Sequence, residues 1–146
     1  MTTVSASKFI SAPKEAVWQV ISNTDSELNC WSAIRSISMV DQERRQVSTI
    51  FGFKFIESID MEPKKSIIVH ILDGPFTGAK TIELKAVDND NSTIVDISWN
   101  IHVNGTMRIF SFFVQRYIII RQTRNALERI AQIIIAADRI EQKHRS

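Results

Sequence analysis

The residues of this chain that could do chemistry are few and widely spaced. Cys30 is the only cysteine, and the three histidines are His70, His102 and His144. A cysteine beside a tryptophan on a short apolar segment behaves as a small buried hydrophobic residue more often than as a reactive thiol. The histidines lack the short spacing of metal ligands, so we predict no metal site and no disulfide.

Nucleophilic and phosphate-binding motifs are also missing from the sequence. It contains no Gly-x-Ser-x-Gly or Cys–His signature. The segment from Gly74 to Gly78 contains a proline and a phenylalanine and leads into a strand, so it does not read as a phosphate loop. No catalytic constellation is visible, whether the chain is an enzyme is left open, and we expect no cofactor.

Four polar residues are the candidates for general acid–base work. Asp60, His70 and Glu83 lie in predicted strands whose two faces are hard to assign, and Tyr117 lies in a predicted helix. A cyclase or dehydratase needs little more than one such pair and good positioning of the substrate. This enzyme hypothesis requires at least two of them to converge in one cavity.

The C-terminal part of the chain offers a second kind of polar group. One line along the predicted helix, at steps of four and three residues, contains Phe113, Tyr117, Ile120, Arg124, Leu127, Ala131 and Ile134. If that line faces a sheet, Tyr117 and Arg124 point into the interior, where a guanidinium could pair with a ligand carboxylate. The alternative is that Arg124 lies at the edge of the apolar stripe and extends into water.

Hydrophobic periodicity predicts the elements that must position these groups. A first strand over Val4–Ile10 is followed by two short helices, one after Pro13 and one from Asp25 or Ser26 to Trp31. Period-two patterns then predict strands from Ile34 to the charged turn Asp41–Arg45, and over Val47–Phe53, Phe55–Met61, Ser66–Leu72, Thr81–Val87 and Thr93–Val103. A long amphipathic helix follows from about Ile109. This order predicts an α+β fold in which the helix covers one apolar face of an antiparallel sheet.

Composition sets the scale and the class of protein. The chain has 146 residues, of which 44% are hydrophobic, and a net charge of +2. We therefore expect a single domain over residues 1–146, and the small positive charge does not indicate a nucleic-acid partner. The longest apolar stretch, Ile109–Ile120, is too short to span a bilayer, and the N-terminus lacks a signal peptide. We expect a soluble, cytoplasmic protein without stable membrane insertion, in which the apolar residues either fill a core or line a cavity.

The start of the chain resembles a known family. A strand, Ala-Pro, a short helix with Val-Trp, an acidic break and a tryptophan before the next strand are similar to the START-related, birch-pollen-allergen-like superfamily (SRPBCC). Within it, the likeness is to the polyketide cyclase/dehydrase and lipid-transport branch. The matching residues are Ala12, Pro13, Val17, Trp18, Asp25 and Trp31, and the Gly74–Gly78 segment resembles a loop between two strands of that family. The resemblance implies a helix-grip fold, with a curved antiparallel sheet of about six to seven strands around the long C-terminal helix.

The same resemblance implies a cavity between sheet and helix for a small hydrophobic molecule such as a lipid, a quinone or a polyketide. Binding or carriage of such a ligand is the leading hypothesis, and a cyclase or dehydratase is the alternative. We expect the ligand to be contacted by Trp31, His70, Trp99, Phe113, Tyr117 and Arg124. Pockets of this kind are mostly apolar with a few orienting polar groups.

The start of the long helix carries a third hypothesis. It is apolar nearly all round, with Phe110, Phe112, Phe113, Ile118 and Ile119 close together. A helix with one exposed face is seldom so apolar. This segment is either buried beneath the sheet and the two short helices, or forms a pocket mouth, a patch that touches a membrane or an interaction surface such as that of a homodimer.

Overall fold

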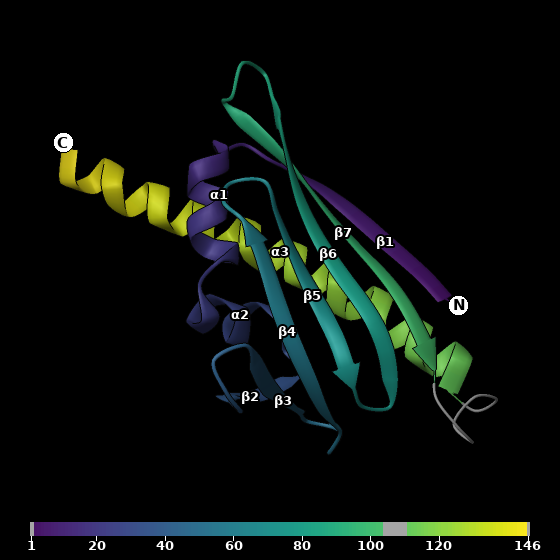
Figure 1. Cartoon of the computed structure of the whole chain (residues 1–146). Helices are drawn as coiled ribbons and strands as arrows, with labels where there is room; N and C mark the ends of the chain where they lie inside the picture. Colours follow the sequence, from purple (N-terminus) through teal and green to yellow (C-terminus); the bar gives the residue numbers. More distant parts are fainter. Residues whose placement is uncertain (1, 104–110, 146) are drawn as a thin grey trace.

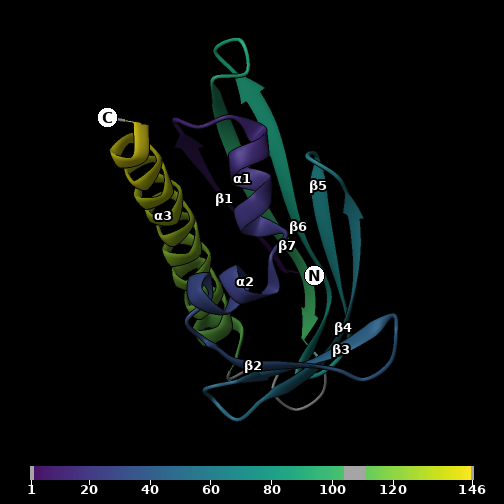
Figure 2. The same cartoon turned by 90° about the vertical axis from the view of Figure 1, so that its left-hand side faces the viewer.

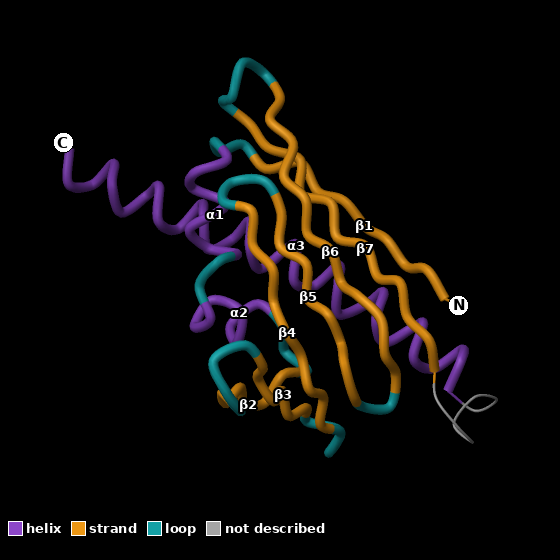
Figure 3. Tube along the Cα trace, in the orientation of Figure 1, coloured by secondary structure: helices purple, strands orange, loops and turns teal. Residues whose placement is uncertain are grey.

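The chain folds as one curved antiparallel sheet whose concave face is covered by helices (Figures 1 and 3). The computed structural model describes residues 2–103 and 111–145. Within these ranges the elements are β1 (Thr2–Ile10), α1 (Lys14–Ile21), α2 (Thr24–Cys30), β2 (Ile34–Met39), β3 (Arg44–Thr49), β4 (Lys54–Glu62), β5 (Ser66–Asp73), β6 (Phe76–Val87), β7 (Ser92–Val103) and α3 (Ser111–Arg145).

The sheet is a meander of β2 to β7, with β1 added at the edge beside β7. The strand order is β1-β7-β6-β5-β4-β3-β2, and every neighbouring pair is antiparallel. The helix α3 packs against β1 and β7, and α1 fits between α3 and the strands β6 and β7. Figure 2 shows β2 and β3 running across the lower end of the space between the sheet and α3. The predicted α+β helix-grip fold is confirmed.

The alternation of side chains in the strands defines the concave face. In β7, Val95, Ile97 and Ile101 are almost fully buried, while the intervening polar residues point to the opposite face. A half-buried antiparallel strand has this pattern because successive side chains alternate between faces. The apolar phase of each strand therefore points towards α3.

Two element boundaries differ from those expected from the sequence. The strand β3 begins at Arg44 and ends at Thr49, so Arg45 lies in the sheet and not in a charged turn, and residues 50–53 form the loop to β4. The strand β6 begins at Phe76 and runs through Gly78, which we had placed in a connection. A side chain at Gly78 would meet the backbone oxygen of Asn100 at 2.0 Å, so glycine here allows close approach of β7.

The second short helix begins one residue before the expected start. The side chain of Asn23 accepts a hydrogen bond of 2.8 Å from the backbone N–H of Asp25 and so caps α2, which begins at Thr24. This cap sets the direction of α2, which ends at Cys30 and delivers Trp31 to the interior.

Candidate functional site

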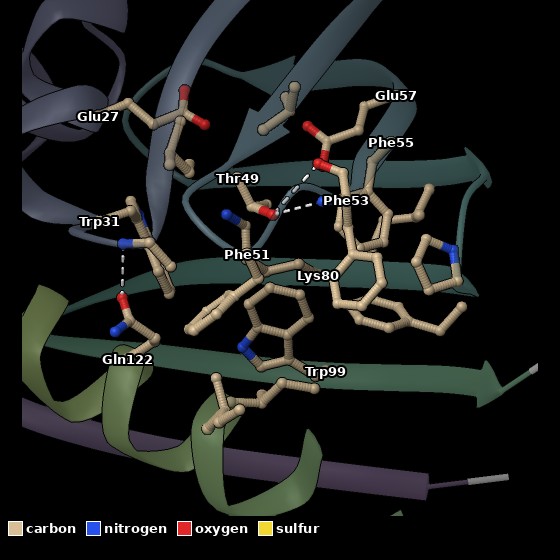
Figure 4. A pocket seen from close by; sticks show the side chains of 18 residues that line it. Glu27, Trp31, Thr49, Phe51, Phe53, Phe55, Glu57, Lys80, Trp99 and Gln122 are labelled. Carbon is tan, nitrogen blue, oxygen red and sulfur yellow. Dashed lines mark hydrogen bonds between the residues drawn. The ribbon is translucent and has the colours of Figure 1, made fainter. Parts of the chain in front are cut away.

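An apolar cavity lies between the sheet and α3, at the end where β2 and β3 cross beneath them (Figure 4). Its volume is about 140 Å³. The strands contribute most of the wall, the segment after α2 contributes one side, and Ile118, Ile119 and Gln122 of α3 close the top. Six of the lining residues are aromatic: Trp31, Phe51, Phe53, Phe55, Phe76 and Trp99.

The aromatic wall is built from rings that hold one another in place. The rings of Trp31 and Trp99 meet edge to face with centroids 5.8 Å apart, and Phe76 meets Trp99 in the same way at 6.4 Å. The indole Nε1 of Trp99 donates a hydrogen bond of 2.9 Å to the hydroxyl of Thr123 on α3. Edge-to-face pairs and a satisfied indole N–H both favour one ring orientation, so the wall is preorganised.

The rim of the cavity is tied to α3 by Gln122. Its side-chain oxygen accepts hydrogen bonds of 3.1 Å from the hydroxyl of Ser32 and from the backbone N–H of Ala33. On the other side, Phe51 and Phe53 in the loop between β3 and β4 are 51% and 39% exposed while still lining the cavity. These two rings therefore mark the side on which the cavity meets solvent.

Next to the aromatic wall lies a buried group of charges. Arg45 on β3 is 5% exposed and stands directly opposite Glu57 in the register of β3 and β4. Its guanidinium donates to both carboxylate oxygens of Glu27 on α2, at 2.9 and 2.6 Å, and to Glu57 Oε1 at 3.1 and 2.9 Å. The planar fork of arginine suits such bidentate pairing, so Arg45 links α2 to the sheet.

The pKa values within this group follow from burial and pairing. Burial raises the pKa of Glu27, but the hydrogen bonds from Arg45 and the charges of Lys80 and Arg45 outweigh it and hold that pKa below its ordinary value. Burial also lowers the pKa of Arg45, and the two glutamates raise it again, to above its ordinary value. Both groups are therefore charged at neutral pH.

A second buried cation lies between the charges and the aromatic wall. Lys80 on β6 is 5% exposed and lines the cavity. Its Nζ lies 4.1 Å from the ring centroid of Trp31 and 5.2 Å from that of Trp99. A cation over an indole face is attracted by the negative face of the ring, so the two tryptophans stabilise the ammonium without supplying a hydrogen-bond acceptor.

Of the residues that we expected to contact a ligand, the structure brings Trp31 and Trp99 together in the cavity wall. His70 lies elsewhere. It is on the phase of β5 opposite to Val69 and Ile71, so it points away from the cavity, and its Nε2 is 2.9 Å from the carboxylate of Asp60. The sequence left the direction of His70 open because apolar residues flank it on both sides.

The expected line along the long helix follows the face that meets the sheet only in its second half. Tyr117 is 64% exposed and Arg124 is also exposed, so neither points into the cavity. The side chain of Phe113 lies outside the described residues. The face that packs against the sheet contains Leu127, Ala131 and Ile134 of the expected line, together with Ile119, Thr123, Ala126 and Ile130, which the line did not include.

The acid–base candidates do not meet in the cavity. The Asp60 and His70 side chains are 78% and 40% exposed on the outer face of the sheet, and Glu83 is exposed on the outward-facing side of β6.

The apolar start of the long helix lies only partly within the described residues. Phe110 and the side chains of Phe112 and Phe113 lie outside the described residues, and Ile118 and Ile119 line the cavity.

Cys30 is buried in the apolar core, and burial raises the pKa of its thiol to about 11. A thiol with such a pKa is almost entirely protonated at neutral pH and is a poor nucleophile. Within residues 2–103 and 111–145, no three His, Cys, Asp or Glu side chains gather as metal ligands. None of the helices in those ranges is long and apolar enough to cross a bilayer.

The buried charges are the site residues that the sequence analysis missed. Lys80 is in phase with the inward residues Ile82 and Leu84, and Glu57 is in phase with Phe55. The period-two pattern of the predicted strand Phe55–Met61 therefore also marked Glu57 as inward-facing. Lys80 lies one residue before the predicted strand Thr81–Val87, and its direction follows only when that pattern is extended towards the start of β6. Arg45 was hidden because it was assigned to a turn.

The fold is shared with solved structures of very low sequence identity. A protein from Thermus thermophilus matches with a TM-score of 0.79 and 14% identity, over 93% of this chain and 99% of that one. A START superfamily protein from Mycobacterium smegmatis matches with a TM-score of 0.76 and 10% identity, over 92% and 98% of the two chains. The Zhui aromatase/cyclase from Streptomyces sp. R1128 matches with a TM-score of 0.73 and 10% identity, over 91% and 93%.

The sequence comparisons found no match. No protein-family model matches the chain, and no curated protein matches it significantly. Identities of 10–14% over nearly the whole length show a common helix-grip fold. They do not carry the ligand or the activity of any of these proteins over to this chain.

Proposed function

We propose that this protein binds a small hydrophobic molecule in the cavity between its sheet and α3. The observation that carries the proposal is an aromatic-lined cavity of about 140 Å³ whose rings are held in place by one another and by α3. An apolar cavity of roughly 150 Å³ in another protein holds a benzene-sized molecule. The enclosed part of this cavity therefore suits one aromatic ring, with room for a longer ligand to pass Phe51 and Phe53.

Binding or carriage is favoured over catalysis by the positions of the polar residues. The residues that the sequence offered as acids and bases lie on the outer face of the sheet or on the exposed side of α3. The two carboxylates that do line the cavity, Glu27 and Glu57, are paired with Arg45. A cyclase or dehydratase needs such a group within hydrogen-bond reach of the substrate. We expect the ligand to be carried in the cytoplasm.

The test is a ligand screen on the intact chain, with two matched substitutions. Ala33 lines the cavity, whereas Ala137 lies on the exposed side of α3. Native mass spectrometry and thermal shifts are recorded with fatty acids, quinones and small aromatic ketones. We expect wild type and Ala137→Phe to bind the same compounds and Ala33→Phe to lose them. Absence of any bound compound, or equal binding by a folded Ala33→Phe, would contradict the proposal.

A further inference from the structure

Lys80 combines deep burial with unmet hydrogen-bonding capacity. It lies opposite Val69 and Trp99 in the register of the sheet, and the cavity lies in front of it. In the described part of the chain, no hydrogen bond or ion pair joins its Nζ to another residue. Its neighbours are the indole rings of Trp31 and Trp99, which supply no acceptor of the usual kind.

A buried ammonium with three N–H donors is costly unless acceptors meet it. An indole face offsets part of the charge, but it does not replace a directed hydrogen bond to oxygen. The carboxylates nearby are paired with Arg45, which donates to both oxygens of Glu27 and to Oε1 of Glu57, and among the described residues no hydrogen bond joins Nζ of Lys80 to Oε2 of Glu57. A hydrogen-bond acceptor for Nζ of Lys80 would therefore best come from a ligand in the cavity.

The charge balance of the site selects the kind of acceptor. Two cations, Arg45 and Lys80, face two carboxylates, Glu27 and Glu57, so the group is neutral when all four are charged. An anionic ligand would add a third negative charge close to two carboxylates in a poorly solvated space. An uncharged acceptor leaves the balance intact, and the aromatic walls favour a planar molecule.

We propose that Lys80 anchors the carbonyl oxygen of an uncharged aromatic ligand, such as a ketone or a quinone, by donating a hydrogen bond from its Nζ. This inference rests on the proposed function and specifies the class of ligand. The indole rings of Trp31 and Trp99 hold the amine at the wall, and the ring of the ligand lies among the aromatic residues beyond it.

The anchor does not depend on one protonation state. Burial lowers the pKa of Lys80, the charges of Glu27 and Glu57 raise it, that of Arg45 lowers it, and the result lies below the ordinary value. An ammonium and a neutral amine both carry N–H donors, so both donate to a carbonyl oxygen.

Three probes of nearly equal size separate the contributions: ethylbenzene has no acceptor, acetophenone has a neutral carbonyl, and benzoate is an anion. Affinities are measured by NMR titration for wild type, Lys80→Met and Lys85→Met, the last being an exposed lysine of the same strand. We expect wild type and Lys85→Met to bind acetophenone about tenfold more tightly than ethylbenzene, because a hydrogen bond from a charged donor contributes about that factor. In Lys80→Met the ratio falls to about one. Benzoate binds more weakly than acetophenone.

Three results would overturn the anchor. They are equal binding of acetophenone and ethylbenzene by wild type, an unchanged ratio in Lys80→Met, and a Lys80-dependent preference for benzoate. The ¹⁵N resonance of Lys80 Nζ in wild type gives a second readout if Lys80→Met does not fold. Acetophenone should shift it and ethylbenzene should not, and equal shifts count against the anchor. If no probe binds wild type at all, the proposed cavity function fails as well.

Discussion

Near α1, side chains from three layers meet and leave a cavity of only about 40 Å³, whereas near β2 and β3 the space between sheet and helix holds a cavity of about 140 Å³. We call the first region the filled end; it contains Val17 of α1, Val95 and Ile97 of β7, and Ala126 and Ile130 of α3, all buried. We call the second the hollow end; it is the cavity with its aromatic wall and buried charges.

The difference comes from what lies between the sheet and α3. At the filled end α1 inserts small and branched side chains that pack closely against both layers. At the hollow end the short helix α2 lies beside α3 (Figure 2), and the space next to it is lined by aromatic rings and by the charged side chains of Glu27, Glu57 and Lys80. One fold thus uses the inward-facing strand positions to build a packed core at one end and a cavity at the other.

The largest expected effect is at the hollow end, where Arg45 joins α2 to the sheet. Arg45→Met leaves Glu27 and Glu57 buried without their partner, and breaking such a pair costs about 3–5 kcal/mol of unfolding free energy. Chemical denaturation measures it. Arg44→Met is the matched control, because Arg44 is exposed and pairs with exposed Asp41, and it should unfold nearly as wild type does. Similar losses for both variants would contradict the role given to Arg45.

A pair of isoleucines on α3 compares the two ends directly. Ile134 at the filled end and Ile119 at the cavity wall are 7% and 6% exposed. Ile134→Ala should cost about 2–5 kcal/mol, because it opens a new cavity. Ile119→Ala only enlarges an existing one and should cost about 1 kcal/mol less. Equal losses in denaturation would indicate that the hollow end is packed as tightly as the filled end.

Acid should weaken the hollow end through Glu27. Its pKa in the folded protein lies below the ordinary value of 4.5, so its stabilising contribution is complete above about pH 4.5 and is lost as pH falls through the folded value. The difference in unfolding free energy between wild type and Glu27→Gln should therefore shrink on acidification below that pH. A difference that stays constant between pH 7 and pH 3 would show that Glu27 is not stabilised as a carboxylate.

The smallest effect is expected on the outer face of the sheet. Asp60 and His70 form an exposed pair that belongs to neither end, and Asp60→Asn should change the unfolding free energy by less than about 1 kcal/mol. The affinity for acetophenone should not change, because both side chains point away from the cavity. A loss of binding on this substitution would restore the pair as a functional site.

The fold is predicted well from the sequence, because the hydrophobic periodicity of a strand or helix can be recognised without knowing which elements it packs against. Strict alternation in Thr93–Val103 identified β7 and its inward face, and the order of elements indicated a helix over a meander. The long helix is harder, because its apolar residues support more than one stripe. Neighbouring helix positions are about 100° apart, so the buried face that includes Thr123 leaves Arg124 outside. Tyr117 is also outside, whereas Leu127, Ala131 and Ile134 of the same expected line are buried.

The residues of the candidate site are harder to predict from the sequence, for a different reason. The roles of these charged residues depend on contacts with distant parts of the chain. Lys80 lies over the ring of Trp31, and Arg45 pairs with Glu27 and Glu57. Alternation can show that a charged residue of a strand faces inward. Only the folded arrangement shows that Arg45 pairs with the two glutamates and that Lys80 is left available to donate to a ligand.

Xenon binding in a crystal tests the contrast between the two ends most directly, because xenon occupies apolar cavities irrespective of ligand chemistry. We predict a xenon atom at the hollow end, among Trp31, Phe76 and Trp99, and none among Val17, Val95 and Ile97 at the filled end. A hollow end closed by side chains, with no xenon in it, would contradict the account.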